Sequence, residues 1–436
     1  MSEAQMLEYN GQSNIGVAES GKAVAAGVIG HILEWYDFAV YGYLALHIAA
    51  NFFPSHDHTA SLLASLASLA TFGLGFVARP LGGVLFGRIG DRHGRKAVLI
   101  WTLVLMGAAT FAIGLVPTYG VIGQLAPILL VVARLVQGFS AGGETTAAAA
   151  FIVEWAPPNQ RGLFGSFQQV GSAAGLLLGT LVVAALTSSL DAATMASWGW
   201  RIPFLIGIAL APIGFIIRSR VKETPIFKRQ QDTLKREDET STGFKRMVFN
   251  AFLFALFWSV GFYFFLSYMP TFAQRELKIE AGKVYWICSA GSLVYMAAIP
   301  FFGFLSDKIG RKPVLLLSCS AFALGLLPLF IAFAANPTPS FMLLVVGICA
   351  VMLAAYTGPA AATLSEFFPS HNRSTGMAVG YSLATVIFGG FTPFMATWQI
   401  AVFHTTLAPI YYVIACAAIG GVFVFSIRET ACDEMH

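Results

Sequence analysis

The chain has 436 residues, of which 57% are apolar and only 11% are Asp, Glu, Lys or Arg. Soluble proteins carry about 25% charged residues, and a mean hydropathy of +0.72 implies more apolar surface than one soluble core could bury. This composition argues against a soluble enzyme, a nucleic-acid-binding protein and a secreted domain. The sequence predicts an all-α protein that crosses a membrane many times.

Twelve stretches of the chain are long and apolar enough to span a bilayer, which takes about 20 residues as a helix. They are 23–49, 61–86, 97–117, 121–146, 161–188, 199–218, 247–273, 284–305, 313–334, 340–363, 374–398 and 406–427. The first 22 residues are polar and lack the basic start and the cleavage site of a signal peptide. We therefore expect the first apolar stretch to be retained.

Basic residues predict the orientation, because Lys and Arg concentrate on the cytoplasmic side of a membrane. Most of the 26 Lys and Arg lie on the side that holds both termini, and the opposite side has only Arg201, Arg275, Lys278 and Lys283. The longest polar stretch runs from Arg218 to Arg246 and is too charged to enter a bilayer. We expect five segments with both termini in the cytoplasm: a tail 1–22, a six-helix bundle 23–218, a linker 219–246, a second six-helix bundle 247–427 and a tail 428–436.

The two halves of the chain repeat each other. The motif G-R-I-G-D-R-H-G-R-K at 87–96 follows the second predicted helix, and G-F-L-S-D-K-I-G-R-K at 303–312 follows the eighth. Two weaker repeats are Glu154, Pro157 and Arg161 against Glu366, Pro369 and Arg373, and Lys222-Glu223-Thr224 against Arg428-Glu429-Thr430. Three repeats in the same order indicate an internally duplicated protein.

The duplicated loop resembles the signature loop of the major facilitator superfamily. Four further motifs resemble its metabolite:proton symporter family: E-W-Y-D-F at 34–38, R-P-L-G-G at 79–83, Q-G-F-S-A-G-G-E at 137–144 and W-G-W-R-I-P-F at 198–204. The resemblance extends from about residue 22 to 430 and implies two pseudo-symmetric six-helix bundles in a bacterial inner membrane. That family includes carriers of 2-oxoglutarate, citrate, shikimate and zwitterionic osmolytes.

Charges inside the predicted helices need a functional explanation, because one charge at the bilayer centre costs at least ~2.5–3.5 kcal/mol. The first half carries six ionisable residues of this kind: His31, Glu34, Asp37, Arg79, Arg134 and Glu144. The apolar segments of the second half contain no comparable charge. We therefore expect the functional site to depend mainly on the first half.

The acidic residues of the first half suggest a proton carrier. At 100° per residue, His31, Glu34, Asp37 and Tyr41 share one face of the first helix. Two carboxylates so close together cannot both ionise at low cost, so one is expected to bind and release a proton. We predict that Glu34, Asp37, Glu144 and His31 serve proton coupling. The alternatives are a static ion pair between a carboxylate and an arginine, and a core histidine with no relay role.

The two arginines suggest the substrate, because a guanidinium group matches a carboxylate with two parallel hydrogen bonds. We predict import of a small organic anion, a di- or tricarboxylate such as citrate or 2-oxoglutarate. The alternatives are a zwitterionic osmolyte of the betaine or proline type and another metabolite such as shikimate, with the arginines as internal counter-ions. The predicted substrate-binding residues are Arg79, Arg134, Gln137, Tyr41, Gln168, Tyr263 and Tyr356.

The resemblance also implies alternating access, in which two bundles rock around a central site. Salt bridges between the halves at the cytoplasmic side are predicted from Asp91, Arg95, Glu154, Arg161, Asp307, Arg311, Glu366 and Arg373. We expect no metal and no cofactor, with the proton as coupling ion, and no enzymatic activity, because no zinc-ligand or nucleophile motif is present. The expected partners are a small substrate, protons and membrane lipids, without nucleic acid, and one chain is expected to suffice.

Overall fold

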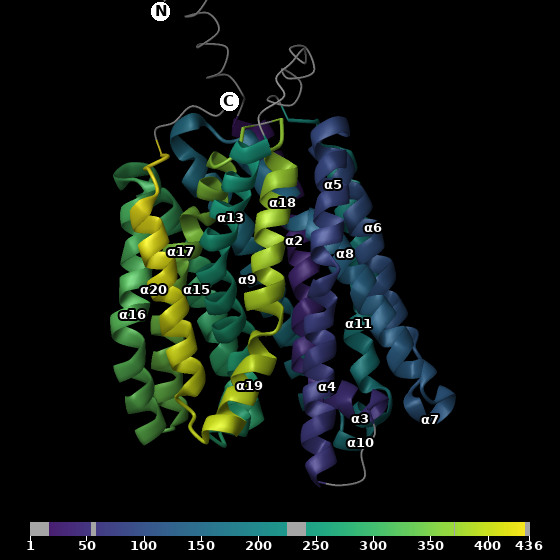
Figure 1. The fold of residues 1–436 in the computed structure, drawn as a ribbon. Coiled ribbons are helices and arrows are strands. Elements are labelled where there is room, and N and C mark those ends of the chain that lie inside the picture. The colour runs from purple at the N-terminus through teal and green to yellow at the C-terminus, as the bar shows by residue number, and fades with distance from the viewer. Residues whose placement is uncertain (1–16, 54–57, 225–240, 370, 432–436) are drawn as a thin grey trace, which may run out of the picture.

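The computed structural model describes residues 17–53, 58–224, 241–369 and 371–431, and every regular element in these ranges is a helix. Figure 1 shows the helices of the first half, purple to teal, beside those of the second half, green to yellow. Parts of the predicted N-terminal tail (1–16), of the central linker (225–240) and of the C-terminal tail (432–436) lie outside the described residues.

The first half contains six membrane-length segments. They are α2 (Val17–Tyr43) with α3 (Ala45–Phe52), α4 (His58–Val77) with α5 (Arg79–His93), α6 (Arg95–Leu115), α8 (Leu125–Glu154), α9 (Arg161–Ser189) and α11 (Ile202–Ser219). Short helices α7 (Tyr119–Ile122) and α10 (Ala192–Ser197) lie at the end of the molecule opposite to the junction of α5 and α6 (Figure 1).

The second half repeats this arrangement. It consists of α13 (Ser241–Phe262) with η3 (Tyr263–Tyr268) and α14 (Met269–Arg275), α15 (Ala281–Ile309), α16 (Arg311–Ala335), α17 (Pro339–Glu366), α18 (Arg373–Ala384) with η4 (Thr385–Gly390) and α19 (Thr392–Phe403), and α20 (Ala408–Ser426). Ten segments of the described chain are long and apolar enough to cross a membrane. With α2 and α11 they form the predicted twelve-helix fold.

Several helices differ from their predicted limits. The predicted fourth span ends at residue 146, but α8 continues to Glu154, because residues 147–153 are also apolar and the buried Glu154 pairs with Arg95 of α6. Two spans are not uniform α-helix, since η3 and η4 are π-helical turns. Such turns are rare and are frequent at functional sites.

The sequence suggested that the duplicated motif is a loop. In the structure it is the end of one helix, a one-residue turn and the start of the next helix. The α5 helix continues to His93, and Gly94 alone separates it from α6, with φ of 99°. Gly310 separates α15 from α16 in the same way, with φ of 101°. Only glycine adopts this conformation without strain. The end of the molecule that holds these two turns is called the glycine-turn end below.

The halves contact each other at both ends. At the glycine-turn end, a Cβ at Gly303 would lie 2.6 Å from the carbonyl oxygen of Gly162, and one at Gly87 would lie 2.8 Å from Thr375 Cα. Toward the other end, a Cβ at Gly73 would lie 2.7 Å from the ring of Phe391. The two halves are therefore in contact above and below the residues at mid-membrane, so the structure is closed toward both ends.

Candidate functional site

The polar face predicted for the first helix is present and buried in α2. His31, Glu34 and Asp37 have relative exposures of 0%, 1% and 4%. Arg79 begins α5, and Arg134 lies nine residues after the start of α8, both at 0% exposure. Glu34, Asp37, Arg79 and Arg134 are called the charged cluster below.

Glu34 is held by residues from three helices. Its Oε1 accepts a hydrogen bond from Arg79 Nη2 at 3.0 Å, and the Thr145 hydroxyl lies 3.2 Å from both carboxylate oxygens. His31 Nδ1 lies 3.3 Å from Glu34 Oε2. Glu34 thus forms the ion pair that the sequence left open as an alternative, while its proton-coupling role stays a prediction.

The Trp35 side chain determines the protonation pattern of His31. Its Nε1–H donates to His31 Nε2 at 3.1 Å. Because an indole nitrogen can only donate, His31 Nε2 must accept, and the proton of the neutral imidazole lies on Nδ1, facing Glu34. A second proton on His31 would break the bond from Trp35. This geometry favours a core histidine over a proton relay in the closed structure.

Asp37 is connected to Arg134 through two uncharged side chains. The Thr110 hydroxyl donates to Asp37 Oδ2 and accepts from Gln137 Nε2 at 2.8 Å. Arg134 Nη1 donates to Gln137 Oε1 at 2.7 Å. Asp37 also borders a cavity of about 10 Å³ between α2, α6 and α11, close to the space that one water needs. The carboxylate therefore lacks a direct cationic partner among the described residues, which suits a group that changes protonation.

The two arginines of the charged cluster retain free hydrogen-bond donors. Within the described part of the chain, Arg79 Nε and Nη1 and Arg134 Nε and Nη2 are buried without a hydrogen-bond partner. Leaving a buried charged donor unpaired costs several kcal/mol. An incoming carboxylate that accepts from these groups would remove that cost, so the arrangement favours a carboxylate ligand.

Aromatic rings surround both guanidinium groups. Arg79 Cζ lies 4.3 Å from the ring centroid of Phe76 and 4.8 Å from that of Phe38. Arg134 Cζ lies 4.2 Å from the ring centroid of Tyr41 and 5.0 Å from that of Phe38. The site is therefore buried and rich in ring faces that attract cations.

Glu144 belongs to a separate ion pair. Its carboxylate accepts from both terminal nitrogens of Arg218 and from the Thr102 hydroxyl. The sequence placed Arg218 at the start of a cytoplasmic loop, but its side chain is 1% exposed and folds back between α2, α6 and α8. Paired in this way, Glu144 has the counter-ion that the sequence did not identify.

The remaining predicted ligands differ in their availability. Gln168 Nε2 donates to the carbonyl of Thr145 at 2.6 Å, and the Tyr356 hydroxyl donates to the carbonyl of Phe254 at 2.7 Å. The Tyr356 hydroxyl is thereby committed to its neighbour, whereas Gln168 Oε1 is buried without a hydrogen-bond partner among the described residues. The buried Tyr263 hydroxyl has no hydrogen-bond partner within the described ranges, so it is free to meet a ligand.

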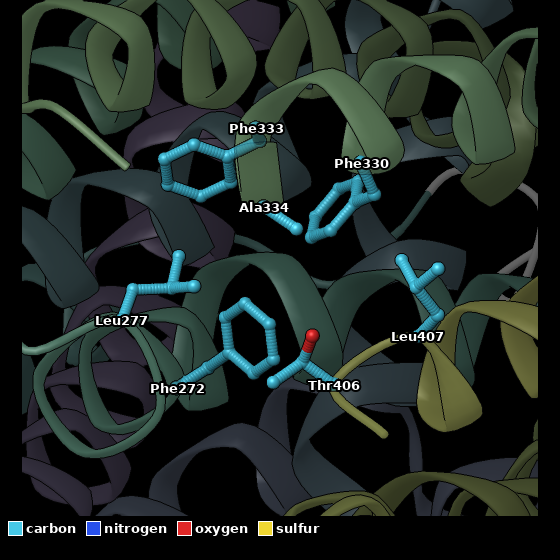
Figure 2. A pocket seen from close by; sticks show the side chains of 7 residues that line it. All are labelled: Phe272, Leu277, Phe330, Phe333, Ala334, Thr406 and Leu407. Atoms are coloured by element: carbon cyan, nitrogen blue, oxygen red, sulfur yellow. The ribbon is translucent and has the colours of Figure 1, made fainter. Parts of the chain in front are cut away.

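A surface hollow at the end opposite to the glycine turns is a different feature. Figure 2 shows Phe272 and Leu277 facing Phe330, Phe333 and Leu407 there. Its lining is apolar except for Thr406 and belongs entirely to the second half. Without a charged side chain it offers nothing to orient a polar substrate, and the charged cluster remains the candidate site.

At the glycine-turn end, two aspartates connect the halves by capping helices. Asp91 accepts hydrogen bonds from the Ser374 and Thr375 amides at 3.2 and 3.0 Å, at the start of α18. Asp307 accepts from the Gly162 and Leu163 amides, both at 2.8 Å, at the start of α9, just after Arg161. Each carboxylate thus binds the positive end of a helix of the other half.

The predicted salt bridges between the halves need correction. Arg95 pairs with Asp91 and Glu154 in its own half, and Arg311 pairs with Asp307 and Glu366 in its own half. An ion pair that does cross between the halves joins Glu154 of α8 to Arg373 of α18, at 3.1 Å. Arg95 and Arg311 therefore orient the aspartates, and these carboxylates cross to the other half by binding helix amides.

A glutamate after each half caps a helix of the same half. Glu223 accepts from the Lys96 amide at 3.0 Å, and Glu429 accepts from the Arg311 and Lys312 amides at 2.8 and 2.9 Å. Burial alone would raise the pKa of the Glu429 carboxyl, but the backbone N–H groups that donate to it hold its pKa below the usual value. The stability that Glu429 contributes to the folded state is therefore fully present above the ordinary carboxyl pKa. It is lost as the pH falls through the lowered pKa of the folded protein.

Under the alternating access that the resemblance implies, the Asp91→Asn variant is expected to transport more slowly with little loss of substrate affinity. An amide keeps one acceptor oxygen but loses the charge that attracts the α18 N-terminus and Arg95, which weakens the closed arrangement of the halves. We expect the maximal uptake rate to fall about tenfold while the half-saturation constant changes less than threefold. The matched control is Asp191→Asn, since the exposed Asp191 caps α10 within one half. Equal losses of rate and affinity would contradict a gating role.

Comparisons with known proteins show the family to which the chain belongs. Residues 23–248 match the family model described as Sugar (and other) transporter, and residues 251–431 match that of the Major Facilitator Superfamily. The Proline/betaine transporter of Escherichia coli (strain K12) is 36% identical over 425 residues, which cover 94% of this chain and 84% of that protein. The chain belongs to the major facilitator superfamily.

Other relatives and solved structures support the same assignment. The Glycine betaine/proline/ectoine/pipecolic acid transporter OusA of Dickeya dadantii (strain 3937) is 35% identical over 433 residues, covering 94% of this chain and 83% of OusA. The proton:xylose symporter XylE, bound to 6-bromo-6-deoxy-D-glucose, shares the fold, with a TM-score of 0.81 at 20% identity over 96% of this chain and 98% of XylE. The inward-open conformation of XylE from E. coli gives 0.70 at 20% identity over 94% of this chain and 97% of XylE.

The family is one of multi-pass membrane transporters, so this chain is a transporter of a small molecule and not an enzyme. The predicted di- or tricarboxylate finds no support in these comparisons, because the relatives cited are named for proline, betaine and related zwitterions. The arginines alone could not separate the two classes, since a zwitterion of this kind also carries a carboxylate.

Proposed function

We propose that this protein is a proton-coupled importer of zwitterionic osmolytes of the betaine or proline type. The observation that carries the proposal is the charged cluster, where free donors of Arg134 and Arg79 lie beside two carboxylates in a buried site between the halves. The proposal also rests on relatives that are 35–36% identical and are named for such substrates. We propose a bacterial inner-membrane location, with the glycine-turn end and both termini in the cytoplasm, and a single chain as the working unit.

The net charge of the cluster argues against a substrate with more than one carboxylate. With Glu34 and Asp37 ionised, two carboxylates balance Arg79 and Arg134. One proton on Asp37 leaves the charge of Arg134 uncompensated, and a single substrate carboxylate can then bind its free Nε and Nη2 edge. A di- or tricarboxylate would bring one or two further negative charges into a buried site that has no cation left for them.

Coupling follows from the link between Asp37 and Arg134. Because Thr110 and Gln137 connect the two side chains, the protonation state of Asp37 sets how strongly Arg134 attracts an anion. Substrate binding outside then requires a loaded proton, and loss of that proton inside weakens the hold on the substrate. The Glu34–Arg79 pair keeps its own charges balanced throughout.

The test is uptake into proteoliposomes that contain the purified protein. Radiolabelled betaine, proline, citrate, 2-oxoglutarate and shikimate are supplied with and without an inward proton gradient. We expect gradient-driven accumulation of betaine or proline. Accumulation of citrate or 2-oxoglutarate instead would restore the anion prediction, and accumulation of shikimate would support the remaining alternative. Transport that ignores the gradient would refute proton coupling.

A further inference from the structure

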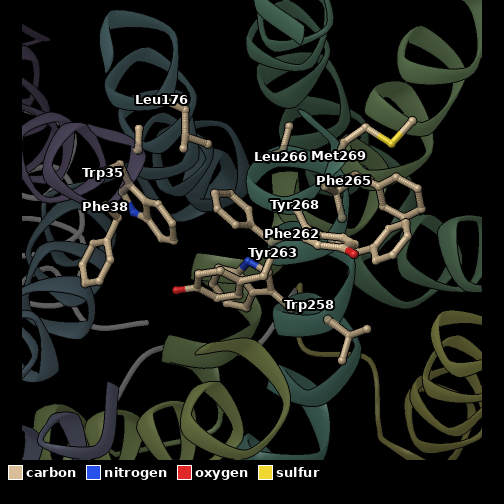
Figure 3. Close-up of a cluster of buried hydrophobic side chains, with 14 of the residues drawn as sticks. Trp35, Phe38, Leu176, Trp258, Phe262, Tyr263, Phe265, Leu266, Tyr268 and Met269 are labelled. Carbon is tan, nitrogen blue, oxygen red and sulfur yellow. The ribbon is translucent and has the colours of Figure 1, made fainter. Parts of the chain in front are cut away.

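Four aromatic side chains beside the charged cluster form a closed circuit. The ring centroids of Trp35 and Phe38 are 5.9 Å apart, those of Phe38 and Phe76 4.9 Å, those of Phe76 and Tyr263 5.2 Å, and those of Tyr263 and Trp35 5.6 Å. All four side chains are at most 3% exposed. Figure 3 shows Trp35 and Phe38 on one side and Tyr263 on the other, with its hydroxyl directed toward the first half.

The circuit is divided between the two halves. Trp35 and Phe38 belong to α2 and Phe76 to α4, whereas Tyr263 begins η3 of the second half. Its ring packs against η4, where a Cβ at Gly389 would lie 2.8 Å from Tyr263 Cδ2. Under the proposed alternating access, rocking of the halves would separate Tyr263 from the other three rings and bring it back.

The electrostatic surroundings of the circuit suit a cation. Aromatic ring faces attract cations, and the attraction is strongest where water is excluded. Arg79 already stacks on two of the four rings. The Glu34 carboxylate, one residue before Trp35 and bonded to Arg79 Nη2 at 3.0 Å, supplies a negative charge nearby. A carboxylate on Arg134 would leave the attached ammonium group next to the ring of Phe38, which Arg134 also contacts.

We propose that Trp35, Phe38, Phe76 and Tyr263 form the binding site for the ammonium end of the substrate and select quaternary over secondary ammonium groups. This inference rests on the proposed function and adds to it the residues that set the preference. A trimethylammonium group cannot donate hydrogen bonds, so it gains most from ring faces. A secondary ammonium group, such as that of proline, can also be held by hydrogen bonds and depends on the rings less.

The test compares ligands that differ in methylation. Competition against labelled substrate is measured for glycine betaine, dimethylglycine, sarcosine and proline, with wild type and three variants. In Tyr263→Leu the ring is lost, and we expect the half-inhibition concentration of glycine betaine to rise about tenfold or more while that of proline rises less than threefold. In Tyr263→Phe the ring remains, and the ratio of the two values is expected to stay as in wild type.

The matched control is Phe265→Leu in the same π-helical segment. Phe265 contacts Phe322 and Phe330 of the second half and lies outside the circuit, so its loss should leave the ratio unchanged. Retained proline binding shows that Tyr263→Leu is folded, and Phe76→Leu repeats the test if it is not. An equal effect on all ligands, or none, would overturn the aromatic site. Wild-type protein that binds neither glycine betaine nor proline would instead refute the proposed function.

Discussion

The Asp37→Asn variant is expected to lose accumulation of substrate against its gradient while keeping exchange of internal for external substrate. Asparagine resembles a permanently protonated Asp37, so Arg134 stays available for the carboxylate but no proton is released inside. In proteoliposomes with an inward proton gradient, the ratio of internal to external substrate should fall to about one. Counterflow of labelled for unlabelled substrate should continue.

The control for this variant is Asp191→Asn, which removes an exposed carboxylate far from the charged cluster. It should accumulate substrate as wild type does. If Asp37→Asn also accumulates substrate to the wild-type level, Asp37 is not the coupling group. Glu34→Gln would then be the next variant, because Glu34 is the other carboxylate of the cluster.

The Arg134→Lys variant is expected to bind substrate about tenfold more weakly or worse. Lysine keeps the positive charge but lacks the planar pair of donors that matches a carboxylate. Hydrogen bonds to charged groups contribute about 1.5–3 kcal/mol each, and each 1.4 kcal/mol corresponds to a tenfold change in affinity. The half-saturation constant for uptake, measured at a fixed proton gradient, reports the change.

The conservative control is Arg275→Lys, since Arg275 is 37% exposed and pairs with its neighbour Glu276. Its half-saturation constant should remain at the wild-type value. If Arg134 served only as the counter-ion of Asp37, lysine could replace it, and the affinity would change less than threefold. That result would remove Arg134 from the substrate site.

The sequence predicted the fold because the bilayer imposes length and composition on every span. The two glycine-turn motifs also revealed the repeat, since both halves need the same backbone conformation at Gly94 and Gly310. The end of α8 was placed too early, because residues 147–153 are also apolar and the helix ends only at Glu154, which bonds Arg95 and Thr224. The π-helical turns η3 and η4 could not be predicted from hydropathy, because their residues are as apolar as the rest of their spans.

For the site, the sequence identified the charges but not their partners. Helical geometry placed His31, Glu34 and Asp37 on one face, yet Thr110 and Thr145 come from other helices and resemble any threonine of a membrane helix. Arg218 was assigned to a loop because it lies at the end of an apolar stretch. Only the three-dimensional structure shows it paired with Glu144.

The aromatic residues could not have been selected from the sequence. Phe and Trp are common in membrane helices, and the chain contains 38 Phe and 8 Trp. Trp35, Phe38, Phe76 and Tyr263 stand out only because their rings contact one another across the boundary of the halves. The repeat does not point to them either, since three of the four lie in one half.

The two halves contribute unequally to the candidate site, and this has a consequence for engineering. Among the described residues, the charged cluster and its polar partners lie in the first half, whereas the second half contributes Tyr263 from a π-helical turn. A chimera that keeps residues 1–224 and takes its remaining helices from a related carrier would therefore keep the proton-coupling residues of this protein. Its preference among ammonium groups would change only through the residue at the position of Tyr263, because the other three rings of the circuit would come from residues 1–224.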